Sequence, residues 1–290
     1  MYNSFLSVVI VLQQPQEARL LPDCLQRLYE VLRENFSDYE IILVNNWPGL
    51  SVDDDIAPLP DELKHNLYLL TLSRNTNKNH AILAGLDRSN GDYTLIYEFD
   101  FCEQPKLAVQ LFERSRAENS DIVYLRARDR RVGWQFRPLY KLFYFILRRY
   151  SALRIDELAH NTRIISRRAL NSLLRLRENL RYMKAIYSIV GYRTSYIETD
   201  EPLESRTEGS FSERFRTSLV AITSFTTFLR SLLFWIFLFS LVFLLGVIVN
   251  ALKVKFTGVD VFGNTGEPFS GWTFLVVLIA VFFATTCLNL

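Results

Sequence analysis

The segment LIYEFDFCEQP, residues 95–105, runs from apolar side chains directly into three acidic ones, Glu98, Asp100 and Glu103. Its first half has the length and composition of a buried strand. Because successive strand residues point to opposite faces of a sheet, an extended chain here directs Glu98 and Asp100 to one side and Phe99 to the other. Buried carboxylates need a partner, so the segment predicts a polar site at the end of a buried strand.

Apolar runs with strand-like length recur along the first part of the chain: SVVIVL (7–12), EIILV (40–44), LYLLTL (67–72), YTLIYEF (93–99) and DIVYLRA (121–127). Helix-like segments lie between several of them, at residues 18–36, 80–88 and 106–118. Strands that alternate with helices predict an α/β fold with a Rossmann-like, mostly parallel sheet covered on both faces. Such sheets bind ligands at the carboxyl ends of their strands, which is where the acidic segment lies.

The pattern changes after residue 128. Residues 138–150 have the spacing of a basic, aromatic amphipathic helix, TRIIS (162–166) that of a short strand, and residues 179–190 that of another helix. Residues 211–230 mix aromatic and aliphatic side chains with Ser, Thr and Arg, which is typical of a helix at a membrane interface.

Two stretches without charge follow, SLLFWIFLFSLVFLLGVIVNAL (231–252) and GWTFLVVLIAVFFATTCLNL (271–290). Each is long enough to cross ~30 Å of hydrocarbon as a helix, so the sequence predicts two transmembrane helices. The N-terminus lacks the basic region and apolar length of a signal peptide. Arginines precede the first stretch, which marks its cytosolic side. We therefore expect a cytosolic N-terminal region and a C-terminus that returns to the cytosol.

Charge is unevenly distributed although the net charge is only +2. Residues 16–65 hold eleven acidic and four basic side chains, whereas residues 126–168 hold twelve basic and three acidic ones. A basic block suits anionic lipid headgroups or a phosphorylated substrate, and equally a positive-inside membrane surface. No recognition motif accompanies it, so we expect no nucleic acid partner. The cysteines, Cys24, Cys102 and Cys287, have no CxxC spacing and predict neither a disulfide framework nor a zinc site.

Four blocks occur in order: SVVIVLQQ (7–14), YEIILVNNWP (39–48), LSRNTNKNHAILAGLDRSNGDYTLIYEFDFCEQP (72–105) and HNTRIISRRAL (160–170). Together with the two apolar stretches, they resemble the polyisoprenyl-phosphate sugar transferases, membrane-anchored members of the inverting GT-A glycosyltransferase family 2. The resemblance implies a GT-A domain over residues 1–205, a juxtamembrane segment over 206–230 and a two-helix membrane hairpin over 231–290. It also implies a bacterial inner membrane as the location.

The implied activity is transfer of a hexose or N-acetylhexosamine from a nucleoside diphosphate sugar to a polyprenyl phosphate, with Mg²⁺ or Mn²⁺ as cofactor. The resemblance makes Glu98 and Asp100 the metal ligands, as two carboxylates suit a hard cation. The residues implied to bind the nucleotide sugar are Gln13, Asn45, Asn46, Arg74, Asn75, Lys78 and Glu98. Those implied to bind the acceptor phosphate are Arg128, Arg131, Arg163 and Arg206. Those implied to act in catalysis are Asp100, Asn161, Arg163 and Arg206.

Several polar positions depart from the family pattern. Amides stand at Asn45, Asn46 and Asn161 where acids are usual, and Glu98 replaces an Asp. These changes leave open a non-catalytic scaffold or regulatory subunit. They also leave local structural roles open, with Asn45 and Asn46 forming a turn and the acidic segment capping the next helix. A hydroxyl acceptor would need a carboxylate base, whereas a lipid phosphate is already ionised near neutral pH. The sequence leaves a homo-oligomer open.

Overall fold

The computed structural model describes residues 1–131, 137–151, 155–176, 183–204, 218–220, 222–224, 226–259, 263, 274–275, 277–279 and 281–283. The chain divides into two compact units, Met1–Phe225 and Thr226–Leu290. The first contains the predicted sheet and the second contains the long apolar helix.

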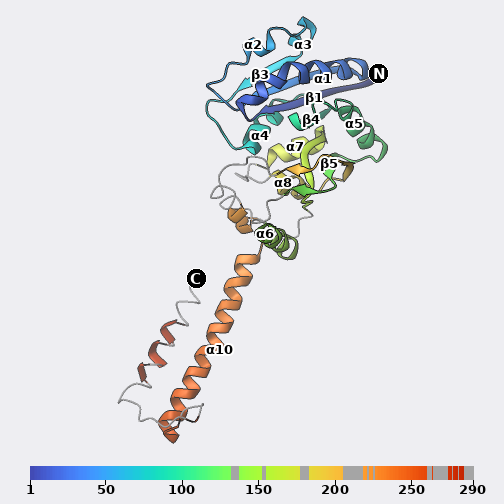
Figure 1. Cartoon of the computed structure of the whole chain (residues 1–290). Helices are drawn as coiled ribbons and strands as arrows, with labels where there is room; N and C mark the ends of the chain where they lie inside the picture. The colour runs from blue at the N-terminus through green and yellow to red at the C-terminus, as the bar shows by residue number, and fades with distance from the viewer. Residues whose placement is uncertain are drawn as a thin grey trace. The chain divides into compact units, whose positions relative to one another are not determined.

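The first unit is built on a seven-stranded sheet with the order β3-β2-β1-β4-β7-β5-β8 (Figure 1). The strands are β1 (Tyr2–Leu12), β2 (Phe36–Asn45), β3 (Leu67–Thr71), β4 (Tyr93–Tyr97), β5 (Ile122–Ala127), β7 (Ala159–Ser166) and β8 (Thr194–Thr199). Neighbours are parallel except that β7 is antiparallel to β4 and β5. The short strands β6 (Arg130–Arg131) and β9 (Leu203–Glu204) pair with each other. The predicted α/β fold with a mostly parallel sheet is confirmed.

Helices cover both faces of this sheet. One core contains side chains of α1 (Leu21–Asn35) and α5 (Leu107–Ala117), and the other contains side chains of α4 (Lys78–Arg88), α7 (Arg167–Arg175) and α8 (Met183–Ile189). The central strand β1 supplies both, because Val8 and Ile10 belong to the first core and Val9 to the second. This alternation is what a strand buried on both faces requires.

Two glycines bring α4 and the start of β4 close to β1. A Cβ atom on Gly85 would lie 2.4 Å from Cγ1 of Val9, so the helix reaches its position only without a side chain there. A Cβ atom on Gly91 would lie 2.7 Å from both the carbonyl oxygen of Phe5 and the amide nitrogen of Ser7. The hydroxyl of Ser7 accepts a hydrogen bond of 2.7 Å from the amide of Gly91, which fixes this approach.

The predicted elements of the first unit are found within a few residues of their expected bounds. The strand expected over residues 93–99 ends at Tyr97, and the basic helix expected over 138–150 is α6 (Arg137–Tyr150). The sequence did not predict the following elements: β8, α7, α2 (Asp53–Ile56), α3 (Asp61–His65) and the 3-10 helices η1 (Pro15–Leu20) and η2 (Phe99–Phe101).

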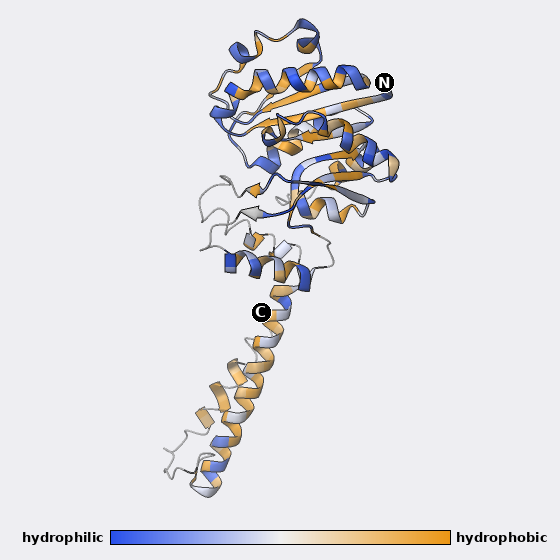
Figure 2. Ribbon diagram, turned by 45° about the vertical axis from the view of Figure 1, so that its right-hand side comes forward, coloured by the Kyte–Doolittle hydropathy of each residue, from blue (hydrophilic) through white to orange (hydrophobic). Residues whose placement is uncertain are grey.

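The second unit contains α10 (Phe228–Thr257), the one helix in the described part of the chain that is long and apolar enough to cross a membrane. Its side chains are apolar along most of its length (Figure 2), with a mean hydropathy of 3.0 over the most apolar 18 residues. It includes the first predicted span, 231–252. Most of the second predicted span, 271–290, and the first part of the interfacial segment, 211–217, lie outside the described residues, so both stay predictions.

Candidate active site

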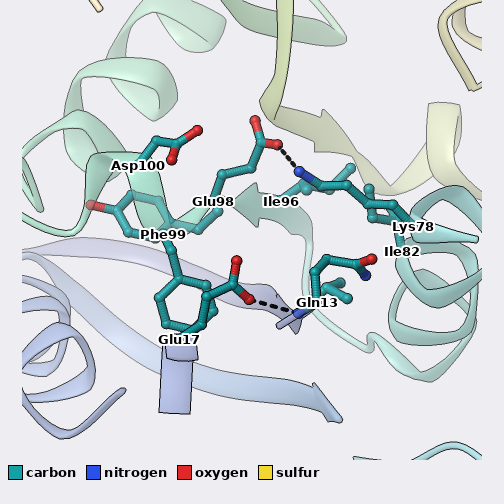
Figure 3. A pocket seen from close by; sticks show the side chains of 10 residues that line it. Gln13, Glu17, Lys78, Ile82, Ile96, Glu98, Phe99 and Asp100 are labelled. Carbon is teal, nitrogen blue, oxygen red and sulfur yellow. Dashed lines mark hydrogen bonds and ion pairs between the residues drawn. The ribbon is translucent and has the colours of Figure 1, made fainter. Parts of the chain in front are cut away.

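A pocket lies where β1 and β4 end and α4 begins. It is lined by Val11, Gln13, Glu17, Lys78, Ile82, Ile96, Tyr97, Glu98, Phe99 and Asp100 (Figure 3). These residues come from three segments that are far apart in the sequence. The carboxyl ends of parallel strands meet at one edge of a sheet, and this topology therefore creates the site.

The acidic segment does not continue as a strand. β4 ends at Tyr97, Glu98 is the N-terminal cap of η2, and Asp100 lies within this 3-10 turn. The alternation argument for a common direction of Glu98 and Asp100 is therefore wrong, although both side chains do line the same pocket. The hydrogen bond from the amide of Phe101 to the carbonyl of Glu98, 3.1 Å, closes the turn.

Both carboxylate oxygens of Glu98 are bound by other residues of the protein. Oε1 accepts hydrogen bonds from Nζ of Lys78 at 2.5 Å and from Nδ2 of Asn161 at 3.0 Å. Oε2 accepts from the backbone amides of Asn161 and Thr162, at 3.0 and 3.1 Å. Glu98 thereby joins the first residue of α4 to β7, on the other side of β4.

These contacts keep Glu98 ionised. Burial alone would raise the pKa of its carboxyl group, but the positive charge of Lys78 and the hydrogen bonds from Lys78 and Asn161 outweigh it and lower the pKa to about 2. The side chain of Glu98 is only 10% exposed. A metal ion could bind this carboxylate only by displacing one of these donors, so the geometry does not favour Glu98 as a metal ligand.

Asp100 differs from Glu98 in every one of these respects. Its side chain is exposed, and within the described part of the chain it makes no hydrogen bond or ion pair. An open carboxylate at the rim of a pocket fits a hard divalent cation, since Mg²⁺ is commonly held by one or two carboxylates together with substrate phosphates and water. No group of three or more His, Cys, Asp or Glu among the described residues could hold a metal by itself. Asp100 is therefore the residue that fits the implied cofactor.

Glu17 is a pocket residue that the sequence did not predict. Its Oε2 accepts hydrogen bonds from the backbone amides of Gln13, 2.7 Å, and Gln14, 3.1 Å, and so caps η1. Burial raises the pKa of its carboxyl group, and the amides of Gln13 and Gln14 oppose that rise. A signal was available, since Glu17 stands three residues after Gln14 in the spacing of a capping box. Beside it, Nε2 of Gln13 is buried and has no hydrogen-bond partner among the residues that the structure describes.

Asn45 and Asn46 are buried at the end of β2, each with 1% of its surface exposed. Asn45 accepts from the amide of Trp47 and donates to the carbonyl of Leu50, both at 2.9 Å, so it shapes the turn. Asn46 accepts from the amide of Thr76, 2.9 Å, and donates to its carbonyl, 2.7 Å. Both amides hold loops in place, which agrees with the turn interpretation and leaves neither open to a nucleoside in this conformation.

The loop held by Asn46 carries two further candidates, Arg74 and Asn75. Both are exposed, and neither makes a side-chain hydrogen bond or ion pair within the described residues. Neither lines the pocket, although they lie in the loop that leads to Lys78, which does.

Arg163 is buried, with 3% of its surface exposed. Its Nε and Nη2 donate to the carbonyls of Asn161, 3.1 Å, and His160, 2.6 Å, and its guanidinium lies 3.8 Å from the centre of the Tyr187 ring. Burial lowers the pKa of this guanidinium, and Tyr187 opposes that effect. Direct contact with a lipid phosphate, which we expected, needs an accessible guanidinium, and the structure instead gives Arg163 a role in shaping β7. Asn161 likewise binds Glu98.

Of the remaining acceptor candidates, only Arg128 has a side chain within the described residues, and it does not line the pocket. Arg128 is exposed and pairs with Asp200, with Nη1 2.5 Å from Oδ1. The side chain of Arg131 and all of Arg206 lie outside the described residues.

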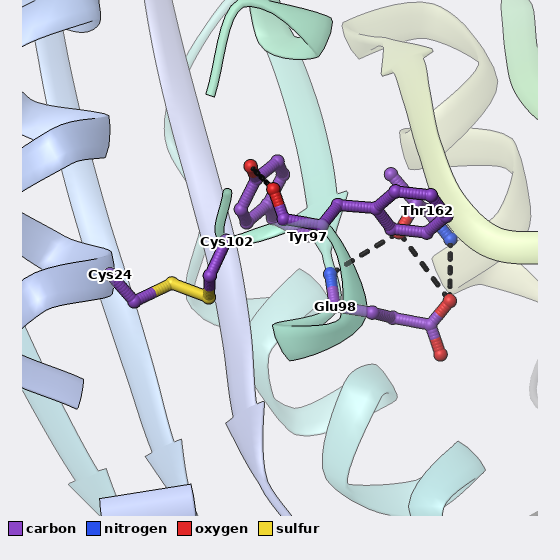
Figure 4. Close-up of a disulfide and its surroundings, with 6 residues drawn as sticks. Cys24, Tyr97, Glu98, Cys102 and Thr162 are labelled. Carbon is purple, nitrogen blue, oxygen red and sulfur yellow. Dashed lines mark hydrogen bonds between the residues drawn. A yellow bond between two sulfur atoms is a disulfide. The ribbon is translucent and has the colours of Figure 1, made fainter. Parts of the chain in front are cut away.

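Cys24 of α1 and Cys102, which follows η2, form a disulfide, with their Cα atoms 4.9 Å apart (Figure 4). The expectation that the cysteines form no disulfide is therefore wrong for this pair. Spacing alone could not show it, because 78 residues separate the two positions. The bond attaches the turn that carries Asp100 to α1.

Comparison with known proteins assigns the family. Residues 7–174, more than half of the chain, match the family model described as Glycosyl transferase family 2. The chain belongs to glycosyltransferase family 2. This family 2 chain is 31% identical to an uncharacterized glycosyltransferase of Synechocystis over 266 residues, 89% of this chain and 81% of the relative. It is 30% identical to the bactoprenol glucosyl transferase of Shigella phage SfV over 217 residues, 72% of this chain and 67% of the relative.

These relatives confirm the resemblance to the polyisoprenyl-phosphate transferase branch, and family membership supports a glycosyltransferase. Among solved structures, glucosyl-3-phosphoglycerate synthase of Mycobacterium tuberculosis, in complex with Mn²⁺, UDP and glucosyl-3-phosphoglycerate, is similar to this family 2 chain with a TM-score of 0.47. The two are 13% identical, over 76% of this chain and 78% of that chain.

Proposed function

We propose that this protein transfers a sugar from a nucleoside diphosphate sugar to a polyprenyl phosphate, with inversion, at the cytosolic face of a bacterial inner membrane. The observation that carries the proposal is a family 2 domain joined in one chain to α10, an apolar helix of 30 residues. A lipid acceptor requires an enzyme at the membrane, and a relative over 72% of this chain is named for bactoprenol.

On the donor side, Lys78, Arg74 and Asn75 would bind the diphosphate and the nucleoside, because they lie together at the start of α4 and in the loop before it. Asp100 would hold Mg²⁺ or Mn²⁺, which when bound would offset the negative charge of the leaving diphosphate. Asn45, Asn46, Asn161 and Arg163 would position the surrounding backbone. Glu98 would keep the ammonium of Lys78 at the pocket through their 2.5 Å contact.

The pocket chemistry favours a phosphate acceptor over a hydroxyl. A hydroxyl must lose its proton to a base as it attacks the anomeric carbon. The resemblance places that base at Asn161, whose amide cannot accept the proton, and the neighbouring Glu98, with a pKa of about 2, is a weak base. A phosphate monoester is ionised near neutral pH and attacks through an oxygen that is already negative. Its reaction depends on alignment and charge, which this pocket can supply.

The direct test is transfer by the full chain in detergent, with polyprenyl phosphate, Mn²⁺ or Mg²⁺ and a panel of nucleoside diphosphate sugars. We expect a sugar-bearing lipid in the organic extract when polyprenyl phosphate is present, and none with the corresponding polyprenol. If no donor gives a lipid-linked sugar while a bactoprenol glucosyl transferase does so under the same conditions, the proposal is wrong.

A second candidate is a non-catalytic scaffold or regulatory subunit of glycan assembly. It is favoured by the hydrogen bonds of Asn45, Asn46 and Glu98, whose side chains are all bound to other residues of the protein. Of the two acidic pocket residues that follow β4, Glu98 and Asp100, only Asp100 has a carboxylate open to a ligand. Thermal unfolding of the full chain with nucleotides and metal separates the two, since a ligand that binds only the folded state raises the midpoint. A shift with a nucleoside diphosphate that is lost in Asp100→Ala supports the enzyme. No shift with any nucleotide supports the scaffold.

A further inference from the structure

The Cys24–Cys102 disulfide lies beside the candidate metal ligand and has no part in the function proposed above. Cys24 is on the buried face of α1, with 2% of its surface exposed, whereas Cys102 is partly exposed and is the C-terminal cap of η2. Cys102 stands two residues after Asp100. The bond therefore connects the outer end of the active-site turn to the hydrophobic core beneath α1 (Figure 4).

Contacts fix the residues on both sides of Asp100, whereas the side chain of Asp100 makes no hydrogen bond or ion pair within the described residues. Before it, Glu98 is fixed by its bonds to Lys78, Asn161 and Thr162. After it, Phe101 is buried, its carbonyl accepts from the hydroxyl of Tyr97, and its ring lies 5.0 Å from that of His160. The disulfide adds the covalent attachment on this side.

We propose that the Cys24–Cys102 disulfide positions Asp100 and that its formation and reduction switch the site between a tight and a loose state. In reduction, a dithiol of small-molecule or thioredoxin-like type gives two electrons and two protons to the protein disulfide. The S–S bond breaks, each cysteine becomes a thiol, and the reductant becomes a disulfide. Formation is the reverse exchange with a low-molecular-weight disulfide. Cys102 is the less buried residue of the pair, and we infer that either reagent reaches the bond from its side.

The loose state follows from the loss of a covalent tie. A crosslink restricts the conformations of the segment that it closes. Without it, the turn from Phe99 to Gln104 keeps the buried ring of Phe101 and its local backbone bonds, those from the amides of Cys102 and Gln104 at 3.1 and 2.8 Å, but loses its covalent tie to α1. An Asp100 that samples more positions binds a metal and a diphosphate less tightly. This effect on ligand affinity rests on the proposed function, whereas the crosslink and its effect on the turn do not.

The first measurement detects the crosslink in the full chain as purified. Denatured protein is alkylated before and after treatment with dithiothreitol, and the labelled cysteines are identified by mass spectrometry. With the disulfide present, one cysteine of the three, Cys287, reacts before reduction and all three react after it. In Cys287→Ser, none reacts before reduction and two react after it. Three reactive cysteines in protein exposed to glutathione disulfide would overturn the proposal.

The second measurement compares oxidised and reduced protein. Amide hydrogen exchange over residues 98–104 is expected to become several-fold faster on reduction, and Mn²⁺-dependent binding of UDP or GDP several-fold weaker. Cys102→Ala should resemble the reduced protein and respond no further to dithiothreitol. Tyr29 lies elsewhere on α1, and its hydroxyl donates a hydrogen bond to Glu62 of α3. Tyr29→Phe removes that bond, is the control for a general loss of stability and should leave both readouts unchanged.

Equal exchange over residues 98–104 in the two redox states of the wild type would overturn the switch, whatever the variants do. If exchange changes but no nucleotide binds in either state, the proposed function fails and the effect on affinity fails with it, while the crosslink stands as a structural one.

Discussion

Glu98 and Asp100 lie two residues apart, and their different environments give them different roles. Glu98 has 10% of its side chain exposed and binds Lys78 and the backbone of β7, whereas Asp100 is open to solvent. In the proposed enzyme, Glu98 positions the cation of Lys78 and Asp100 meets the ligand. An Asp at position 98 would be one methylene shorter, and the observed network depends on the reach of Glu98 both to Lys78 of α4 and to β7.

The ion pair of Glu98 predicts a specific acid sensitivity. Its pKa is lowered from 4.5 to about 2 in the folded protein, so its contribution to stability is complete above about pH 4.5 and is lost as the pH falls toward 2. The shift corresponds to about 3 kcal/mol. We expect Glu98→Gln to lower the thermal midpoint at pH 7 by about 5 °C or more. The gap to the wild type should shrink as unfolding is measured at pH 4 and then at pH 3.

Glu103→Gln is the matched control, since Glu103 is an exposed acid of the same segment. It should change the midpoint little at any pH. A Glu98→Gln variant whose deficit is the same at pH 7 and pH 3 would contradict the ionic role of Glu98.

At the residue scale, the sequence grouped several residues that the structure brings together, but it did not predict the contacts among them. Glu98, Asp100 and Lys78 were all expected in one site, and all three line the pocket. The partner of Glu98 could not be predicted, because Lys78 lies 20 residues earlier in the chain and meets it through the fold. The burial of Arg163 was equally hidden, since an arginine in a short strand reads as accessible until its neighbours are known.

Gly91 shows how tightly β1 and the start of β4 are packed at the scale of elements. We expect Gly91→Ala to destabilise the protein by about 2 kcal/mol or more, because its Cβ would overlap backbone atoms of Phe5 and Ser7, which cannot rotate away as a side chain can. Gly49→Ala is the control, since nothing lies within 4 Å of a Cβ at that position. Thermal unfolding of the two variants side by side tests this, and equal midpoints would contradict the packing.

The elements that the sequence predicted are those with continuous apolar runs, such as β1, β2 and β4. β8 was missed because its residues alternate between exposed and partly buried along the edge of the sheet, which leaves no apolar run. The insertion of β7 between β4 and β5 was not predictable, since strand order depends on pairing between segments distant in the sequence. The same limit applies to Cys24 and Cys102.

At the scale of the whole molecule, the chain combines a family 2 domain with a unit that contains α10. We expect the full chain to cross the membrane twice and to return its C-terminus to the cytosol. A fluorescent protein that folds only in the cytosol, fused at the C-terminus, should therefore fluoresce. A dark fusion that is present in full length, together with an active periplasmic reporter at the same position, would indicate a single span.

The central claim is that the pocket at the end of β4 binds a nucleoside diphosphate sugar. Its most direct test is calorimetric binding of UDP and GDP to the full chain with and without Mn²⁺. The wild type should bind at least one nucleotide, more tightly with the metal, and Asp100→Asn should weaken that binding by about tenfold or more. Glu103→Gln should bind as the wild type does. Equal affinity of Asp100→Asn and the wild type, or no binding of either nucleotide by the wild type, would contradict the account.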